Sequence, residues 1–279
     1  MAYSIRSIFL CLAVISAAWV SPAFAQSVGK VVNVTPGASF LRSGSRVAIA
    51  AGVAVERGDT VVTNRTGLVK IIFDDSTKLA VGPRSKLVVS DVLIGASNRA
   101  ERFTLRAVSG TYRFLSGKSR KEVYDIQTPS ATLGIRGTEF DFTIVTTTLT
   151  DLVSFGGIIF MCNELSSCAF VSGSCSVGQA PSFSPVRAPN DRAERDAILR
   201  SDMPFVVDQS PLSQPFQLNI ASCGQIGPIP AGYVPFREDP KAGPQPLGED
   251  RRTDESDDED DDDYDDDYYD DDYDYSETD

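Results

Sequence analysis

The sequence predicts an all-β protein: an antiparallel β-sandwich or roll of roughly a dozen strands, followed by a disordered acidic tail. Apolar segments of about 5–7 residues alternate with short turns rich in glycine, proline, asparagine and aspartate. No segment of useful length before Pro189 shows a helical period. A short β-solenoid is the alternative architecture, because glycine-marked turns recur along the chain.

The strands follow one another closely from Val28 onward. Asp74-Asp75-Ser76 and Ser109-Gly110 read as turns, and Gly156-Gly157 lies near a turn or marks a bulge. We expect strands over Val28–Val34, Ala38–Arg42, Arg46–Ala50, Thr60–Thr63, Leu68–Phe73, Thr77–Val81, Lys86–Ile94, Arg102–Val108, Thr111–Leu115, Glu122–Gln127, Thr143–Thr150 and Leu152–Met161.

Composition divides the chain into four parts. Residues 1–25 read as a signal peptide, 26–179 as the β-domain, 180–248 as a proline-rich extended arm and 249–279 as a disordered tail. The stretch 181–248 holds 12 of the 16 prolines, so we expect an arm held to the domain only where Cys223 is tied. Within it, Asp191–Arg200 predicts one short helix.

The first residues have the pattern of a secretory signal. Ile8–Val20 is apolar, and Ala23-Phe24-Ala25 fits the small-x-small cleavage site, so the mature chain should begin at Gln26. A membrane anchor is the alternative, but this apolar run is short for a span and no later run is long enough.

Cleavage would leave four cysteines, and an even number in an exported chain predicts two disulfides. Three connectivities are possible. We prefer Cys162–Cys168, which would close a short hairpin, with Cys175–Cys223 pinning the later segment. A zinc site of four thiolates is the alternative, although Cys223 lacks the paired short spacing that such a site needs.

The net charge of −13 hides two opposite regions. Residues 249–279 hold 20 of the 39 acidic residues and two of the 26 basic ones, which leaves 24 basic against 19 acidic residues elsewhere. Carboxylate oxygens suit calcium, so the tail is a candidate for weak, multivalent calcium binding without the fixed spacing of a calcium loop. The candidate ligands are Asp260, Asp261, Asp262, Asp263, Asp265, Asp266 and Asp267.

Enzymatic chemistry has little support. The chain has no histidine, which excludes Ser-His-Asp and Cys-His catalysis and histidine metal ligation. Asp59, Asp74 and Asp75 sit at turns where aspartate serves the backbone. Ser116-Gly117-Lys118-Ser119 resembles the end of a phosphate loop, but Tyr112 stands where the motif needs glycine. We therefore predict neither a catalytic residue nor a cofactor, apart from the calcium possibility on the tail.

Two clusters are candidate binding sites. In Thr128–Phe140, TPSATLGIRGTEF, Arg136 lies between two glycines among apolar neighbours, so we expect it half buried with Glu139 or a carbonyl as partner. That reading is structural, and ligand binding is the alternative. The second cluster is a basic loop that would dock an anionic partner, polysaccharide or the tail, or is simply solvated: Arg113, Lys118, Arg120 and Lys121.

These segments together resemble the FecR domain family, envelope domains named after the regulator of bacterial iron-dicitrate transport. The matching stretches are Gly29–Val34, Val55–Val89, Leu105–Phe114 and Val123–Ile144, and the hallmark Thr-Pro, small residues and Gly-x-Arg-Gly-Thr falls on Thr128–Thr138. The family's regulators also carry a membrane span and a signalling domain, which this chain does not show, and the acidic tail lies outside the family pattern.

The resemblance implies a non-enzymatic binding module of regulatory or scaffold character, periplasmic or secreted, in a Gram-negative bacterium. Its partner would be an envelope protein or polysaccharide. Nucleic acid is a poor partner for the tail because both are anionic. A cation-binding envelope protein that acts through the tail is the alternative function, and a carbohydrate-directed enzyme is a distant third because no convincing carboxylate pair is present.

Overall fold

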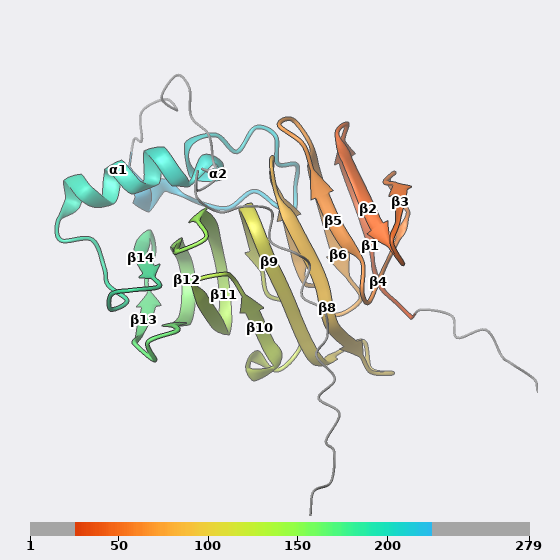
Figure 1. The fold of residues 1–279 in the computed structure, drawn as a ribbon, viewed down its shortest axis with the longest axis horizontal. Helices are drawn as coiled ribbons and strands as arrows, with labels where there is room; N and C mark the ends of the chain where they lie inside the picture. Colours follow the sequence, from red (N-terminus) through yellow and green to blue (C-terminus); the bar gives the residue numbers. More distant parts are fainter. Residues whose placement is uncertain (1–25, 225–279) are drawn as a thin grey trace, which may run out of the picture. The chain divides into compact units, whose positions relative to one another are not determined.

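The computed structural model describes residues 26–224, which form fourteen β-strands and a few short helices (Figure 1). The strands are β1 Ser27–Thr35, β2 Ala38–Arg42, β3 Ser45–Ala48, β4 Ala54–Glu56, β5 Thr60–Thr63, β6 Leu68–Phe73, β7 Lys78–Val81, β8 Lys86–Ile94, β9 Ala100–Leu115, β10 Tyr124–Gln127, β11 Ala131–Thr146, β12 Leu149–Asn163, β13 Cys168–Ser172 and β14 Ser176–Pro181. The helices are η1 Lys121–Val123, α1 Arg192–Asp202, α2 Pro204–Val207 and η2 Ala221–Cys223. The all-β prediction is confirmed.

The strands make one continuous, open sheet that folds over into two layers. The first layer runs β14-β12-β11-β9-β7-β6-β1-β4, and the second runs β13-β12-β11-β10-β9-β8-β5-β2-β3. Within the described residues every strand pairing is antiparallel except β9 with β10. This arrangement is the predicted sandwich or roll and not the solenoid.

The core lies between the layers. Alternate residues of strands such as β8 and β10 are buried there, as expected for a two-residue period. On β9, Phe103 belongs to the second layer, yet its ring packs edge-on against Phe73 of β6 at 4.8 Å and against Phe114 at 6.1 Å. Buried side chains from both halves of β9 therefore share one hydrophobic core.

Three long strands pass from one layer to the other, and each does so at a glycine. Gly110 of β9, Gly137 of β11 and Gly157 of β12 all have positive φ, at 99°, 67° and 78°. The expected turn at Ser109-Gly110 is thus a bend inside a continuous strand. A Cβ at Gly110 would lie 2.1 Å from Ser85 Oγ, so the bend needs glycine for its conformation and for space.

The segment from Asp191 to Gly224 packs on the outer side of the first layer, and we call it the strap. Its helix α1 begins after Asp191, whose side chain accepts a hydrogen bond from Glu194 N at 2.8 Å, which confirms the predicted helix. Phe205, Leu212 and Phe216 of the strap pack on Leu68 and Ala80 of the sheet. The strap is therefore not an extended arm held only at Cys223.

Both preferred disulfides are present in the structure. Cys162–Cys168 closes the β12–β13 hairpin, with the two Cα atoms 4.1 Å apart. Cys175–Cys223 joins the start of β14 to the end of the strap across a separation of 48 residues. The second bond ties the strap to the sheet that it covers.

Candidate functional site

Arg113 is not part of a surface basic patch. Its side chain is 0% exposed and lies on the outer face of the first layer, under the strap. The sequence position next to a basic loop suggested exposure, but Tyr112 and Phe114 point into the core, so the period of the strand sends Arg113 to the opposite face. The strap covers that face, and the alternation of apolar and polar residues along the strand does not predict this cover.

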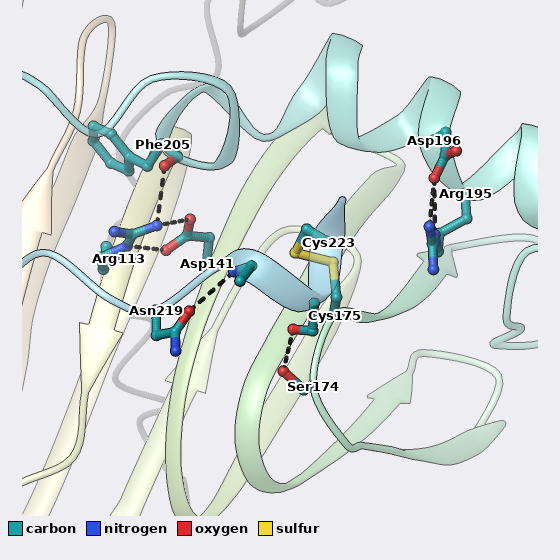
Figure 2. The surroundings of a disulfide bond; sticks show 11 residues. Arg113, Asp141, Ser174, Cys175, Arg195, Asp196, Phe205, Asn219 and Cys223 are labelled. Atoms are coloured by element: carbon teal, nitrogen blue, oxygen red, sulfur yellow. Dashed lines mark hydrogen bonds and ion pairs between the residues drawn. A yellow bond between two sulfur atoms is a disulfide. The ribbon is translucent and has the colours of Figure 1, made fainter. Parts of the chain in front are cut away.

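Every N–H of the Arg113 guanidinium has an acceptor. Figure 2 shows the contacts with Asp141 and Phe205. Nε and Nη2 form a bidentate pair with Asp141 of β11, both at 2.7 Å. The remaining donors reach the side-chain oxygen of Gln209 and the carbonyls of Phe205 at 3.2 Å and Phe216 at 3.3 Å. Burial raises the pKa of Asp141, and the charge of Arg113 opposes that shift.

Other polar side chains of the same face also contact the strap. Lys70 Nζ of β6 donates to Pro211 O and Ser213 Oγ, both at 3.1 Å, and burial lowers the pKa of Lys70. Thr143 of β11 donates to the carbonyl of Asp202. Most hydrogen bonds between sheet and strap therefore run from side chains of the sheet to backbone carbonyl oxygens of the strap.

Two carboxyl groups meet where helix α1 ends on this face. Asp151 of β12 is 1% exposed and accepts a hydrogen bond from Gln179 Nε2 at 3.0 Å. Burial, together with the charge and hydrogen bond of the neighbouring Asp202, raises the pKa of Asp151 to about 8. A carboxyl pair of this kind shares a proton at neutral pH, because two buried like charges repel each other.

Arg136 and Glu139 do not form the expected half-buried pair. Both side chains are exposed, and among the described residues no ion pair joins them. Leu133 and Ile135 of β11 fill the core, which sends Arg136 to the outer face of the second layer. The positive-φ bulge at Gly137 and the register shift between Arg136 and Glu139 then separate the two side chains.

The outer face of the second layer is open in the part of the chain that the structure describes. Arg136 lies opposite Ile158 of β12, and Gly134 lies opposite Phe160. Phe160 in turn pairs with Phe170 of β13, and their ring centroids are 4.9 Å apart. Ile158, Phe160 and Phe170 are 42%, 38% and 67% exposed, and we call them with Arg136 the aromatic patch.

The other end of this open face carries a hollow of about 630 Å³ beside β2, β3 and β5. Arg46 lies at its rim and donates to Ser39 Oγ at 2.9 Å. The hollow is lined by short polar and small apolar side chains. It extends the open face beyond the aromatic patch without adding a buried charged group.

The other predicted loop residues remain near the surface. Lys118 and Arg120 are exposed, while Lys121 is half-buried and donates to Gly117 O at 3.2 Å and to Ser116 Oγ at 3.4 Å. Ser119 donates to the buried carboxylate of Asp75 at 2.7 Å, so part of the loop is structural. The loop offers three cations, without Arg113, for an anionic partner.

The buried carboxylates of the turns serve the fold. Asp59 accepts two hydrogen bonds from Arg42, both at 2.7 Å, and one from Glu56 N at 2.9 Å. Asp75 accepts bonds from Thr77 N, Thr77 Oγ1, Ser119 and Tyr124. These contacts give both carboxylates a role in holding turns and neighbouring strands together.

The calcium candidates Asp260–Asp267, the signal peptide and the acidic tail lie outside the described residues. Between Gln26 and Gly224, no group of three or more carboxylate, cysteine or histidine side chains could hold a metal ion. The same part of the chain has no helix that is long and apolar enough to cross a membrane.

Sequence reasoning missed Lys70, Asp141 and Asp151 as contact residues. A signal for Lys70 was available, since β6 reads LVKIIF and is apolar on both faces, as in strands covered on both sides. The same reading would have placed Lys70 under a covering element. No comparable signal marks Asp151, whose neighbour Asp202 is far along the sequence.

A known protein family matches the central part of the sheet and the sequence motifs that it contains. Residues 59–156 match the family model described as FecR protein. The chain contains a FecR domain. The match spans β5 to the middle of β12 and therefore includes Lys70, Arg113, Arg136 and Asp141, whereas the strap lies outside it.

Solved structures match only part of this chain. A cell surface anchoring domain is 24% identical, covers 24% of this chain and 88% of its own, and has a TM-score of 0.23. Two crystal structures of a candidate anti-sigma factor from Parabacteroides distasonis ATCC 8503 are 10% and 11% identical, cover 54% of this chain and 72% and 71% of their own, and have TM-scores of 0.38 and 0.39. A search of curated protein sequences finds no match.

Proposed function

We propose that this chain is a non-enzymatic binding module of the bacterial cell envelope, with a regulatory or scaffold role, whose partner docks on the open outer face of the second layer. The observation that carries the proposal is the aromatic patch on a face that no described residue covers. The opposite face is occupied by the strap. A domain with one face filled and one face bearing exposed aromatic rings is suited to binding.

The composition of the patch favours a protein partner over a polysaccharide. The rings of Phe160 and Phe170 contact each other, and Arg136 lies opposite Ile158. Aromatic side chains and arginine are enriched among the residues that dominate protein–protein binding. The hairpin that presents the rings is closed by Cys162–Cys168, so little ordering is needed on binding. The resemblance to the FecR family supports a regulatory or scaffold role and leaves both an envelope protein and a polysaccharide open as partners.

Export to the periplasm or beyond is part of the proposal. Two disulfides fit an oxidising compartment, and the signal-like first 25 residues fit delivery to it. Absence of histidine and the structural roles of Asp59 and Asp75 support a non-enzymatic function.

Capture from envelope extract tests the open face. The bait is residues 26–279, and the variant is Phe160→Ser/Phe170→Ser. We expect a captured partner to be lost by the variant and kept by Phe183→Ser, a control that removes a phenylalanine which is 82% exposed in the loop after β14. A second pair compares Arg136→Ser with Arg106→Ser, an exposed arginine of β9 on the same face. A partner retained by the double phenylalanine variant would contradict the proposal.

A further inference from the structure

The strap supplies hydrogen-bond acceptors to buried side chains of the FecR domain. Lys70 and Arg113 belong to the matched family region, but apart from the Arg113–Asp141 pair the hydrogen-bond partners of their side chains belong to residues 203–217, outside it. The face under the strap is therefore built from family-domain residues that need an added segment to satisfy them.

The chemistry of the contact is that of peptide recognition. Arg113 holds the carbonyls of Phe205 and Phe216, and Lys70 holds the carbonyl of Pro211. Every peptide has backbone carbonyls, so hydrogen bonds to them contribute affinity for any sequence. Pockets that accept particular side chains contribute specificity. Here the specific contacts come from Phe205, Leu212 and Phe216, which pack on Leu68 and Ala80.

Lys70 supports this reading because it has no ionic partner of its own. It is 3% exposed, and among residues 26–224 no carboxylate lies within ion-pair distance of its ammonium. A buried ammonium without acceptors is costly. The carbonyl of Pro211 and the hydroxyl of Ser213 are its acceptors, so Lys70 is satisfied only while a peptide lies on this face.

We propose that residues 203–217 occupy, within the same chain, a peptide-binding face on the outer side of the first layer, and that this face can bind an external segment of the same chemistry. The occupant is an irregular peptide with two phenylalanines and a leucine in the spacing of Phe205, Leu212 and Phe216. The site is separate from the open face, so it does not depend on the proposed function.

The strap competes with an external peptide through its covalent ties. The Cys175–Cys223 disulfide fixes one end, and the short connection from Pro181 to Asp191 fixes the other. A segment tethered in this way acts at an effective concentration in the ~mM range, which excludes a dilute competitor. A loosened strap should therefore expose the face to a free peptide.

A peptide-binding experiment on the full mature chain tests the proposal. The loosened variant is Cys175→Ser/Cys223→Ser with Phe205→Ser/Phe216→Ser, which removes the disulfide and two anchors from the strap. The probe is a fluorescein-labelled peptide of residues 203–217, and fluorescence anisotropy reports binding. We expect saturable binding of the probe to the loosened variant and none to the wild-type chain at probe concentrations up to about 100 µM.

Two matched controls identify the contacts. A probe with serine in place of both phenylalanines should bind about tenfold more weakly or not at all. In the loosened variant, Lys70→Ala should weaken the probe by about tenfold, whereas Lys30→Ala, at an exposed lysine of β1, should leave binding unchanged. A folded loosened variant that does not bind the probe would overturn the proposal.

Hydrogen exchange on the wild-type chain keeps the test decisive if the loosened variant does not fold. The proposal requires the strap to leave the face while the sheet stays folded. We therefore expect the amides of Val206, Leu212 and Phe216 to exchange through a local opening of lower free energy than the amides of Phe103 and Phe142. Exchange of both groups only by global unfolding would overturn it.

Discussion

At the scale of single residues, the covered face depends on one buried ion pair. Arg113 and Asp141 are both fully buried, and Arg113 also lies 5.3 Å and 5.7 Å from the ring centroids of Phe155 and Phe205. Removal of one partner from such a pair leaves an uncompensated charge, which is far more costly than removal of both. The pair therefore fixes how the strap lies on the sheet.

Asp141→Ala should lower the free energy of unfolding by about 3–5 kcal/mol, because Arg113 stays buried without its counter-charge. The double variant Arg113→Met/Asp141→Leu should recover much of that loss. Urea unfolding with the disulfides intact measures both. Arg136→Ala is the control and should change stability by no more than about 0.5 kcal/mol, since its side chain is exposed. A loss below about 1 kcal/mol in Asp141→Ala would contradict the role given to this pair.

Asp151 should make stability depend on pH. Its pKa rises from 3.8 to about 8 in the folded chain, so between these values the folded state binds more protons than the unfolded one. The contribution of Asp151 to stability is therefore greatest below about pH 4 and is lost as pH rises towards about 8, by at most about 1.4 kcal/mol per pH unit. Asp151→Asn should flatten this slope in urea unfolding at pH 5, 6, 7 and 8. An unchanged slope would assign the dependence to another group.

At the scale of elements, the sequence predicts strands well and their continuity poorly. Alternation located β6, β8 and both ends of β9 within a few residues, but glycine at Gly110 read as a turn. Glycine supplies positive φ both to turns and to bends within strands, so local sequence does not distinguish them. Whether a turn or a bend forms depends on the layer in which the following residues pair.

Gly157→Ala should disrupt the crossing of β11 and β12. Gly157 has φ of 78°, and a Cβ there would lie 2.0 Å from the carbonyl oxygen of Gly137. We expect a loss of ~3 kcal/mol or more in denaturant unfolding, from strain and from displaced backbone. Gly156→Ala is the matched neighbour, with no atom within 4 Å of the added Cβ, and should be nearly neutral. Equal effects of the two substitutions would rule out the close approach as the cause.

The two disulfides should differ in their contribution to stability. Cys175–Cys223 spans 48 residues and Cys162–Cys168 spans six. If loop entropy dominates, replacement of the long-range pair by serines costs about 4 kcal/mol and replacement of the short-range pair about 2 kcal/mol. Guanidinium unfolding of the two double variants gives the order. The reverse order would show that local packing around the exposed hairpin outweighs the loop term.

At the scale of the whole molecule, the sequence indicates two layers but not what covers each. The alternation places Arg113 and Arg136 on outer faces equally well, yet one is buried and the other exposed. The difference comes from the strap, which proline content marked as an extended arm. Its apolar residues Phe205, Leu212 and Phe216 are too widely spaced for a helical or strand period, so their burial follows from tertiary contacts alone.

The acidic tail gives the last prediction, because its deletion separates binding by the open face from the alternative of binding through the tail. Deletion of residues 249–279 turns a chain of net charge −13 into one with 24 basic and 19 acidic residues. If the open face binds the partner, baits 26–279 and 26–248 should capture the same Phe160-dependent partner, with calcium or with chelator. A segment dominated by like charges gains little from burial in an apolar interface. Capture by the longer bait alone would instead assign binding to the aspartates, and its loss or gain on calcium addition would show whether the cation competes with the partner or bridges it.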